Sequence, residues 1–189
     1  MSAFEFFFSF YGLILGLSVA EIITGFARAL RTRQSLRVGW LTPLLALFVL
    51  MDLASFWAGA WLLLQSIQIT YAFLIAGLTI AAVYYLSASL VIPDDFAAWP
   101  SFDDYFDRHK SQVMLGVVTA NTLAFQILPL LSGQSFQARL EIWSRPDYAL
   151  TIGLYYLLAA AVILVRHRRA NMALLSILIG LYGLQLFAA

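Results

Sequence analysis

The sequence has no cysteine and few charged residues. Of its 189 residues, 11% are charged and 62% are hydrophobic, whereas soluble domains have about 25% charged and about 45 to 50% apolar residues. The missing cysteines exclude disulfides, thiolate metal sites and thiol nucleophiles. A formal net charge of +1 creates no field that attracts nucleic acid, and we expect no nucleic-acid partner. This composition excludes an ordinary soluble domain and a disordered chain, and it predicts a polytopic membrane protein.

Long apolar runs predict the architecture. A helix needs about 20 mostly apolar residues to cross a hydrocarbon core that is roughly 30 Å thick. The runs lack the two-residue alternation that is typical of transmembrane strands. The sequence therefore predicts an all-α fold, a six-transmembrane-helix bundle that forms one domain over residues 1–189. The expected spans are 4–27, 40–64, 69–92, 113–131, 148–165 and 172–188.

The basic residues predict the orientation of these spans. Lys and Arg accumulate in short loops on the cytoplasmic side of a membrane. Nine of the eleven basic residues lie in the segments 28–39, 93–112 and 166–171, and the other two are Arg139 and Arg145. We assign those three segments to the cytoplasm. The N-terminus and the C-terminus are then both periplasmic, in what we expect to be a bacterial inner membrane crossed by a multi-pass protein.

Two acidic residues lie within the expected spans. A charge near the centre of a bilayer costs about 2.5 to 3.5 kcal/mol, so such a residue is a functional candidate. At 1.5 Å of rise per residue, Asp52 lies about 18 Å from the cytoplasmic end of its span, and Glu21 about 10 Å from the same end of its own. If the two spans form an antiparallel hairpin, a bridging water or a shared proton would connect the two acids.

Polar and small residues accompany these acids. Asn121 lies at a similar depth to Asp52, and the hydroxyls of Tyr84 and Tyr155 are donors within reach of either acid. Glu21, Asp52, Asn121 and Tyr155 are therefore the candidate residues for ion or proton handling. In the alternative interpretation, protonated acids tie helices together and Glu21 pairs with Arg28. The glycines expected to allow close helix packing are Gly12, Gly16, Gly25 and Gly59.

The third loop concentrates acidic residues. Asp103, Asp104 and Asp107 have the spacing DDxxD, which resembles the element by which prenyl-diphosphate enzymes hold magnesium. Acids at positions i, i+1 and i+4 of a helix can direct oxygen ligands toward Mg²⁺ and a diphosphate. Arg108 and Lys110 would lie close to the phosphate charge. The resemblance covers these five residues and implies a magnesium site at the cytoplasmic face.

A structural interpretation explains the same residues with fewer assumptions. Ser101 followed by Asp104 is a helix N-capping pattern, which predicts that a helix begins near Phe102, ahead of the fourth span. Acidic residues in a first helical turn interact favourably with the helix dipole. The acidic loop would also form ion pairs with the two basic loops beside it. His109 and His167 lie at the cytoplasmic edge, away from where a haem ligand pair belongs, and we expect no cofactor.

Three functions fit these observations. The first hypothesis is a non-catalytic membrane protein that acts as a subunit of a larger membrane complex or of a homo-oligomer. Its partners would be the lipid bilayer and other membrane subunits or a second copy of the chain. The second is a small proton- or cation-coupled transporter or channel that uses Glu21 and Asp52. The third is a magnesium-dependent lipid-diphosphate enzyme that uses Asp103, Asp104 and Asp107, although an enzyme is less expected than a non-enzyme.

Overall fold

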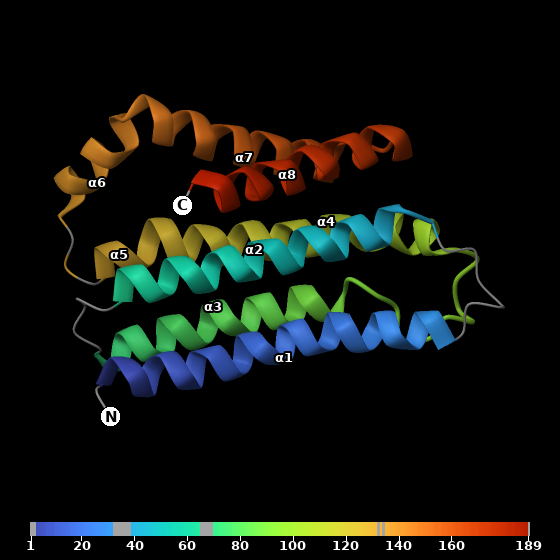
Figure 1. Ribbon diagram of the computed structural model, residues 1–189, viewed down its shortest axis with the longest axis horizontal. Helices are drawn as coiled ribbons and strands as arrows, with labels where there is room; N and C mark the ends of the chain where they lie inside the picture. The colour runs from blue at the N-terminus through green and yellow to red at the C-terminus, as the bar shows by residue number, and fades with distance from the viewer. Residues whose placement is uncertain (1–2, 32–38, 65–69, 132, 134, 189) are drawn as a thin grey trace.

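The computed structural model describes residues 3–31, 39–64, 70–131, 133 and 135–188, and over these residues the chain is all-helical. Long helices run along the molecule in three layers, in which α1 lies with α3, α2 with α4, and α7 with α8 (Figure 1). The elements are α1 (Ala3–Arg31), α2 (Leu41–Leu64), α3 (Tyr71–Ser89), α4 (Phe102–Thr122), the π-helical turn η1 (Leu123–Ile127), α5 (Leu128–Leu131), α6 (Phe136–Ser144), α7 (Pro146–Leu164) and α8 (Arg168–Ala188).

Five helical segments among the described residues are long and apolar enough to cross a membrane. They are Glu5–Arg31, Leu41–Trp61, Tyr71–Ser89, Phe102–Leu130 and Pro146–Leu164. These segments suggest a multi-pass protein in a lipid bilayer. Helix α8 is not among the five, and it begins with Arg168, Arg169 and Asn171.

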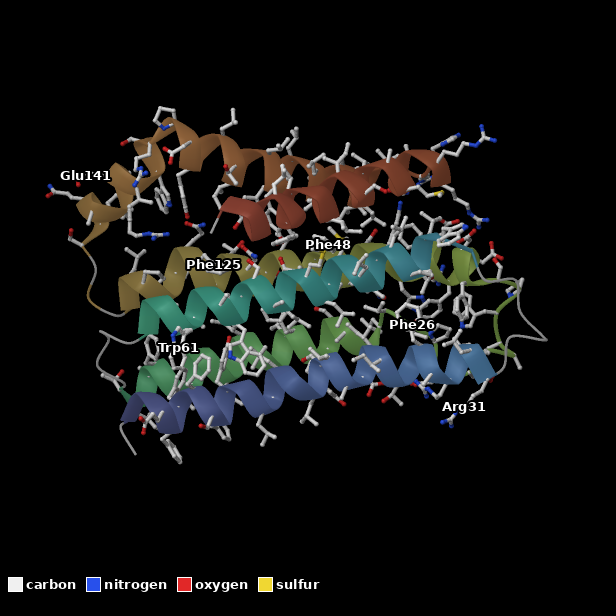
Figure 2. All side chains as sticks on the ribbon, in the orientation of Figure 1. Phe26, Arg31, Phe48, Trp61, Phe125 and Glu141 are labelled. Atoms are coloured by element: carbon white, nitrogen blue, oxygen red, sulfur yellow. The ribbon has the colours of Figure 1, made fainter. Side chains whose placement is uncertain are left out.

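Side-chain burial separates a closely packed apolar interior from an exterior that is also apolar. Phe7, Phe48 and Phe106 are at most 2% exposed, and Phe48 lies between α2 and α8 (Figure 2). Leu13 and Leu17 on α1, in contrast, are 65% and 53% exposed. Large apolar side chains of this kind are unfavourable in water and suit contact with lipid tails.

The ends of several elements differ from those expected. Helix α3 ends at Ser89 rather than at residue 92. Helix α6 was not expected, because its nine residues are too few and too polar to resemble a span. It begins with a cap in which Ser135 Oγ accepts from the backbone N–H of Ala138 at 3.2 Å, and Pro146 starts the next helix. Most of the expected loop 28–39, including Arg33 and Arg37, lies outside the described residues.

Three of the four glycines expected at helix contacts lie against a large side chain. A Cβ atom on Gly12 would lie 3.0 Å from Cζ2 of Trp57, and one on Gly59 would lie 2.9 Å from Cε1 of Phe125. A Cβ atom on Gly25 would similarly lie 3.0 Å from the side chain of Ile92. Gly16 differs, because no described atom outside its own helix backbone comes within 4 Å of such a Cβ atom.

This contrast predicts opposite effects for two alanine substitutions on one helix. Gly12→Ala should lower the free energy of unfolding by about 1 kcal/mol, because the Trp57 ring must move. Gly16→Ala should be neutral or stabilising by up to about 1 kcal/mol, because alanine favours the helix and meets open space. Thermal unfolding in detergent measures both, and equal losses for the two variants would contradict the packing described here.

Candidate functional site

Asp52 lies near the middle of α2 and is 1% exposed. Its Oδ2 accepts a hydrogen bond from the Tyr84 hydroxyl of α3 at 2.7 Å. Its Oδ1 accepts from Asn121 Nδ2 of α4 at 3.3 Å, from the Tyr155 hydroxyl of α7 at 3.2 Å and from the Tyr182 hydroxyl of α8. We call these five residues the Asp52 cluster. Because each carboxylate oxygen offers about two lone-pair positions, Oδ1 with its three donors is fully occupied, whereas Oδ2 with one donor keeps a free position.

Aromatic packing holds the donor rings of the cluster in place. The ring of Phe56 lies 5.2 Å from that of Tyr84, measured between centroids. The ring of Phe48 lies 6.1 Å from that of Tyr182, which in turn lies 6.5 Å from the ring of Tyr155. A tyrosine has an apolar body and a polar tip, so these contacts bury the bodies while the hydroxyls reach the carboxylate.

The four donors around Asp52 are neutral. An ionised carboxylate in an apolar interior is costly unless a positive charge compensates it. A proton on the carboxylate or a cation beside it would supply that charge. Tyrosine hydroxyls can both donate and accept, so the cluster can accommodate Asp52 with or without a proton. The site is therefore chemically suited to take up one positive charge.

A cavity of about 400 Å³ adjoins the cluster. One end is formed by Asn121, Tyr155 and Tyr182, and the other includes Asp147 at the start of α7, whose side chain is 69% exposed. The remaining lining residues are Ser55, Phe125, Tyr148, Thr151, Ile152 and Leu181. The cavity thus connects an exposed acid at one end of the bundle with three of the four donors to Asp52.

A π-helical turn forms part of the cavity wall. In a regular α-helix the carbonyl of Phe125 would accept from the N–H of residue 129, but that residue is Pro129, which has no backbone N–H. Arg139 of α6, only 6% exposed, donates from Nη2 to the Phe125 carbonyl and, at 2.8 Å, to Gln126 Oε1. π-helical turns occur frequently at functional sites.

Gln126 connects this turn to the cavity. Its Oε1 also accepts from Trp143 Nε1 at 2.9 Å, and its Nε2 donates to the hydroxyl of Tyr148 at 3.4 Å. Tyr148 lines the cavity. Helix α6, through Arg139 and Trp143, therefore holds one wall of the cavity in position.

The structure does not bring Glu21 to Asp52. Glu21 Oε1 lies 3.9 Å from Arg28 Nη2, and its side chain is 32% exposed. The expected bridge between the two acids is thus replaced by hydrogen bonds from tyrosine and asparagine to Asp52 alone. The alternative pairing of Glu21 with Arg28 is confirmed.

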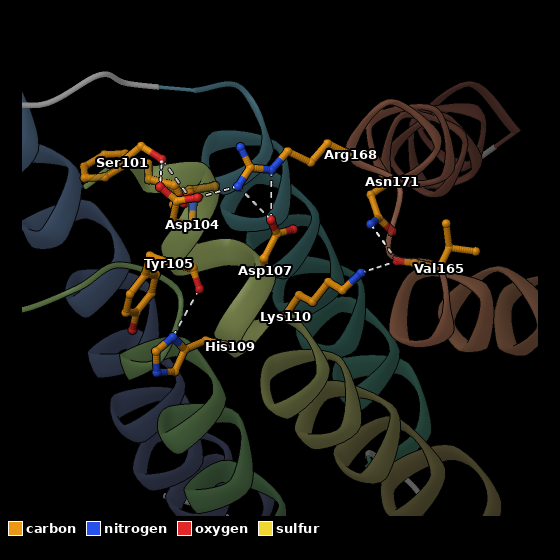
Figure 3. A network of polar contacts seen from close by, with 11 residues as sticks. Ser101, Asp104, Tyr105, Asp107, His109, Lys110, Val165, Arg168 and Asn171 are labelled. Atoms are coloured by element: carbon orange, nitrogen blue, oxygen red, sulfur yellow. Dashed lines mark hydrogen bonds and ion pairs between the residues drawn. The ribbon is translucent and has the colours of Figure 1, made fainter. Parts of the chain in front are cut away.

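The acidic third loop forms a helix cap and ion pairs (Figure 3). Ser101 Oγ accepts from the backbone N–H of Asp104 at 3.2 Å and donates to Asp104 Oδ2 at 2.6 Å. Arg168 at the start of α8 binds Asp104 Oδ1 at 2.5 Å and Asp107 Oδ2 at 2.8 Å. These two contacts raise the pKa of the Arg168 guanidinium above its usual value. Capping and pairing between loops are both confirmed, as is a helix start at Phe102.

This arrangement does not favour the magnesium hypothesis. Asp104 and Asp107 share Arg168, whereas Asp103 lies against Gly39, where a built Cβ atom would be 2.0 Å from Asp103 Oδ1. Within the part of the chain that the structure describes, no three His, Cys, Asp or Glu side chains are placed to hold a metal ion.

Lys110, expected near phosphate, instead caps the end of α7. Its Nζ donates to the carbonyl of Val165, and Asn171 Nδ2 donates to the same oxygen at 2.9 Å (Figure 3). A positive charge at a helix C-terminus is favourable because of the helix dipole. These contacts join α4, α7 and α8 at the end of the bundle opposite the cavity mouth.

Sequence reasoning missed two residues of the site region. Tyr182 has a signal in hindsight, because it follows the buried residues Asn171, Leu175 and Leu178 at spacings of four, three and four residues on one face of α8. No pattern in the sequence indicates Arg139, because its partner is a backbone carbonyl fourteen residues earlier in the chain.

Compared with protein-family models, with curated proteins and with solved structures, the chain matches none of them. Its function is therefore argued from the geometry around Asp52.

Proposed function

We propose that the chain is a small proton- or cation-coupled transporter or channel in which Asp52 takes up the positive charge. The observation that carries the proposal is the Asp52 cluster itself. A carboxylate that is 1% exposed has only neutral donors, and three of these donors line a cavity that reaches the exposed Asp147. Glu21, which pairs with Arg28, is not part of this proposal.

We further propose six spans, with α8 as the sixth, and periplasmic termini in a bacterial inner membrane. The start of α1 and the end of α8 lie toward one end of the bundle (Figure 1). The end of α1 and the starts of α4 and α8 lie toward the opposite end. Arg31 and Glu141 point outward at opposite ends (Figure 2). With the basic end in the cytoplasm, the cavity would open toward the periplasm, and the contacts of Arg168 and Lys110 would close the cytoplasmic end.

Replacing Asp52 by asparagine tests the proposal, because the change keeps the shape but removes the titratable charge. In vesicles that contain the full chain and an entrapped pH dye, a potassium diffusion potential would drive proton entry. We expect the Asp52→Asn variant to lose most of this flux, because an intramembrane carboxylate that handles the charge cannot be replaced by a group that does not titrate.

The matched control is Glu141→Gln, which neutralises an exposed acid on α6 outside the cavity lining. Its flux should equal that of the unmodified protein. Sodium flux, measured with a sodium dye in the same vesicles, separates a coupled cation from a proton. Undiminished flux of both ions in Asp52→Asn would contradict the proposal.

The non-catalytic subunit is the second candidate, and one observation favours it. Four donors from four other helices bind Asp52, as they would in a purely structural tie between helices. Extraction of the native protein in a mild detergent, with the mass of the intact complex and the co-purifying chains determined together, tests this function. A stoichiometric complex with other proteins, combined with Asp52-independent flux, would favour the subunit over the transporter.

A further inference from the structure

We infer that the cavity beside the Asp52 cluster binds a small organic cation, an ammonium group with alkyl substituents, rather than a metal ion. The inference rests on the proposed function, in which Asp52 compensates a positive charge. It adds the chemical class of the ligand, and it follows from the size, walls and charge of the cavity.

The size and the walls of the cavity suit an organic molecule. A volume of about 400 Å³ falls within the range of about 300 to 1,000 Å³ that is usual for small-molecule sites. Four aromatic side chains line it, namely Phe125, Tyr148, Tyr155 and Tyr182. The faces of aromatic rings attract cations and are the usual means of recognising quaternary ammonium groups.

The polar groups of the cavity favour a positive charge. The hydroxyl groups of Tyr155 and Tyr182 donate to Asp52 and keep oxygen lone pairs for a second partner. An ammonium N–H or a polarised methyl group would meet these oxygens, with the carboxylate directly behind them. Asp147 adds an acidic group at the mouth, while Arg145, its ion-pair partner at 3.1 Å, is 66% exposed and outside the lining.

A divalent metal ion fits this arrangement less well. Hard cations take about six or more oxygen ligands in a compact shell. Oδ1 of Asp52 already accepts from three donors, and Oδ2, which accepts from Tyr84, keeps one free position, which is far fewer than such a shell requires. A bulky ammonium ion needs no such shell of oxygen ligands, because it is held by ring faces and by the field of a nearby carboxylate.

Choline and its neutral carbon isostere, 3,3-dimethyl-1-butanol, test the inference because they differ in charge and hardly in shape. Isothermal titration calorimetry with the full chain in a non-ionic detergent, corrected with empty micelles, would measure both probes. We expect choline to bind at least about tenfold more tightly than the isostere. Equal binding of the two probes, or binding of neither, would overturn the inference.

Variants locate the binding. Phe125→Leu removes an aromatic face and keeps an apolar side chain, and Asp52→Asn removes the charge. Each should weaken choline binding at least about fivefold. The matched control is Tyr156→Phe, which removes a hydroxyl that contacts Thr122 at 2.9 Å outside the cavity lining. Its affinity for choline should be unchanged, and an equal loss in all three variants would contradict the proposed site.

The vesicle assay separates the two proposals. If choline fails to bind while proton or sodium flux still depends on Asp52, the ligand class is wrong and the proposed function stands. If choline binds with the expected charge and Phe125 dependence while neither flux depends on Asp52, proton or sodium coupling is wrong and the organic-cation site stands.

Discussion

Asp52→Leu is expected to lower the free energy of unfolding by about 2 to 4 kcal/mol. The substitution leaves three tyrosine hydroxyls and one amide without their shared acceptor. Each intramembrane hydrogen bond contributes about 0.6 kcal/mol on average, and each donor left unsatisfied adds to the loss. Unfolding by sodium dodecyl sulfate in mixed micelles, followed by circular dichroism, would measure the change.

Asp52→Asn is the matched control for this effect. Asparagine can still accept through its oxygen and can donate to tyrosine oxygens through its amide, so we expect a loss below about 1 kcal/mol. A large loss for leucine and a small one for asparagine would show that hydrogen bonding, rather than charge, stabilises the fold at this position. If leucine instead increased stability, the buried charge would outweigh its four hydrogen bonds, contrary to this prediction.

Arg139→Met is expected to lower the free energy of unfolding by about 2 to 3 kcal/mol. Methionine fills similar space but cannot donate to the carbonyl of Phe125, which would lose the donor that the buried Arg139 provides. Gln126 would keep the hydrogen bond that it accepts from Trp143, so the lost stability should come mainly from the π-helical turn. The same unfolding assay would measure it.

Two further variants serve as controls for Arg139. Arg145→Met removes an arginine that is 66% exposed and paired with Asp147. This variant should lower the free energy of unfolding by less than about 0.5 kcal/mol. Pro129→Ala restores a backbone N–H four residues after Phe125 and should recover part of the loss when it is combined with Arg139→Met. A loss of equal size in the two arginine variants would contradict the role assigned to Arg139.

The helices could be predicted because each depends on residues that are close in sequence. Apolar runs of about 20 residues indicate membrane helices whatever surrounds them, and Ser101 with Asp104 indicates a helix start from four residues alone. The depth of Asp52 follows from the rise of its own helix. These inferences require no knowledge of which helices are neighbours.

The partners of Asp52 depended on that missing knowledge. Helices α2 and α8 pack against each other, which brings Tyr182 to an acid 130 residues earlier in the chain. Helix α1 packs against α3 and α2, yet Glu21 lies 3.9 Å from Arg28 on its own helix, whose Nη2 also donates to Asp94 at 2.9 Å. Hydropathy indicates that helices pack but not in which order. The acid and three of its donors, Tyr84, Asn121 and Tyr155, could therefore be named as candidates, whereas the fourth donor, Tyr182, could not.

The convergence of five helices on one carboxylate makes the molecule sensitive to a single event. Asp52 belongs to α2, and its donors come from α3, α4, α7 and α8. A proton that binds Oδ1, where three donors meet, turns at least one of them into an acceptor or releases it, and each donor belongs to a different helix. Protonation of this one side chain therefore alters hydrogen bonds that hold α2 to several other helices at once.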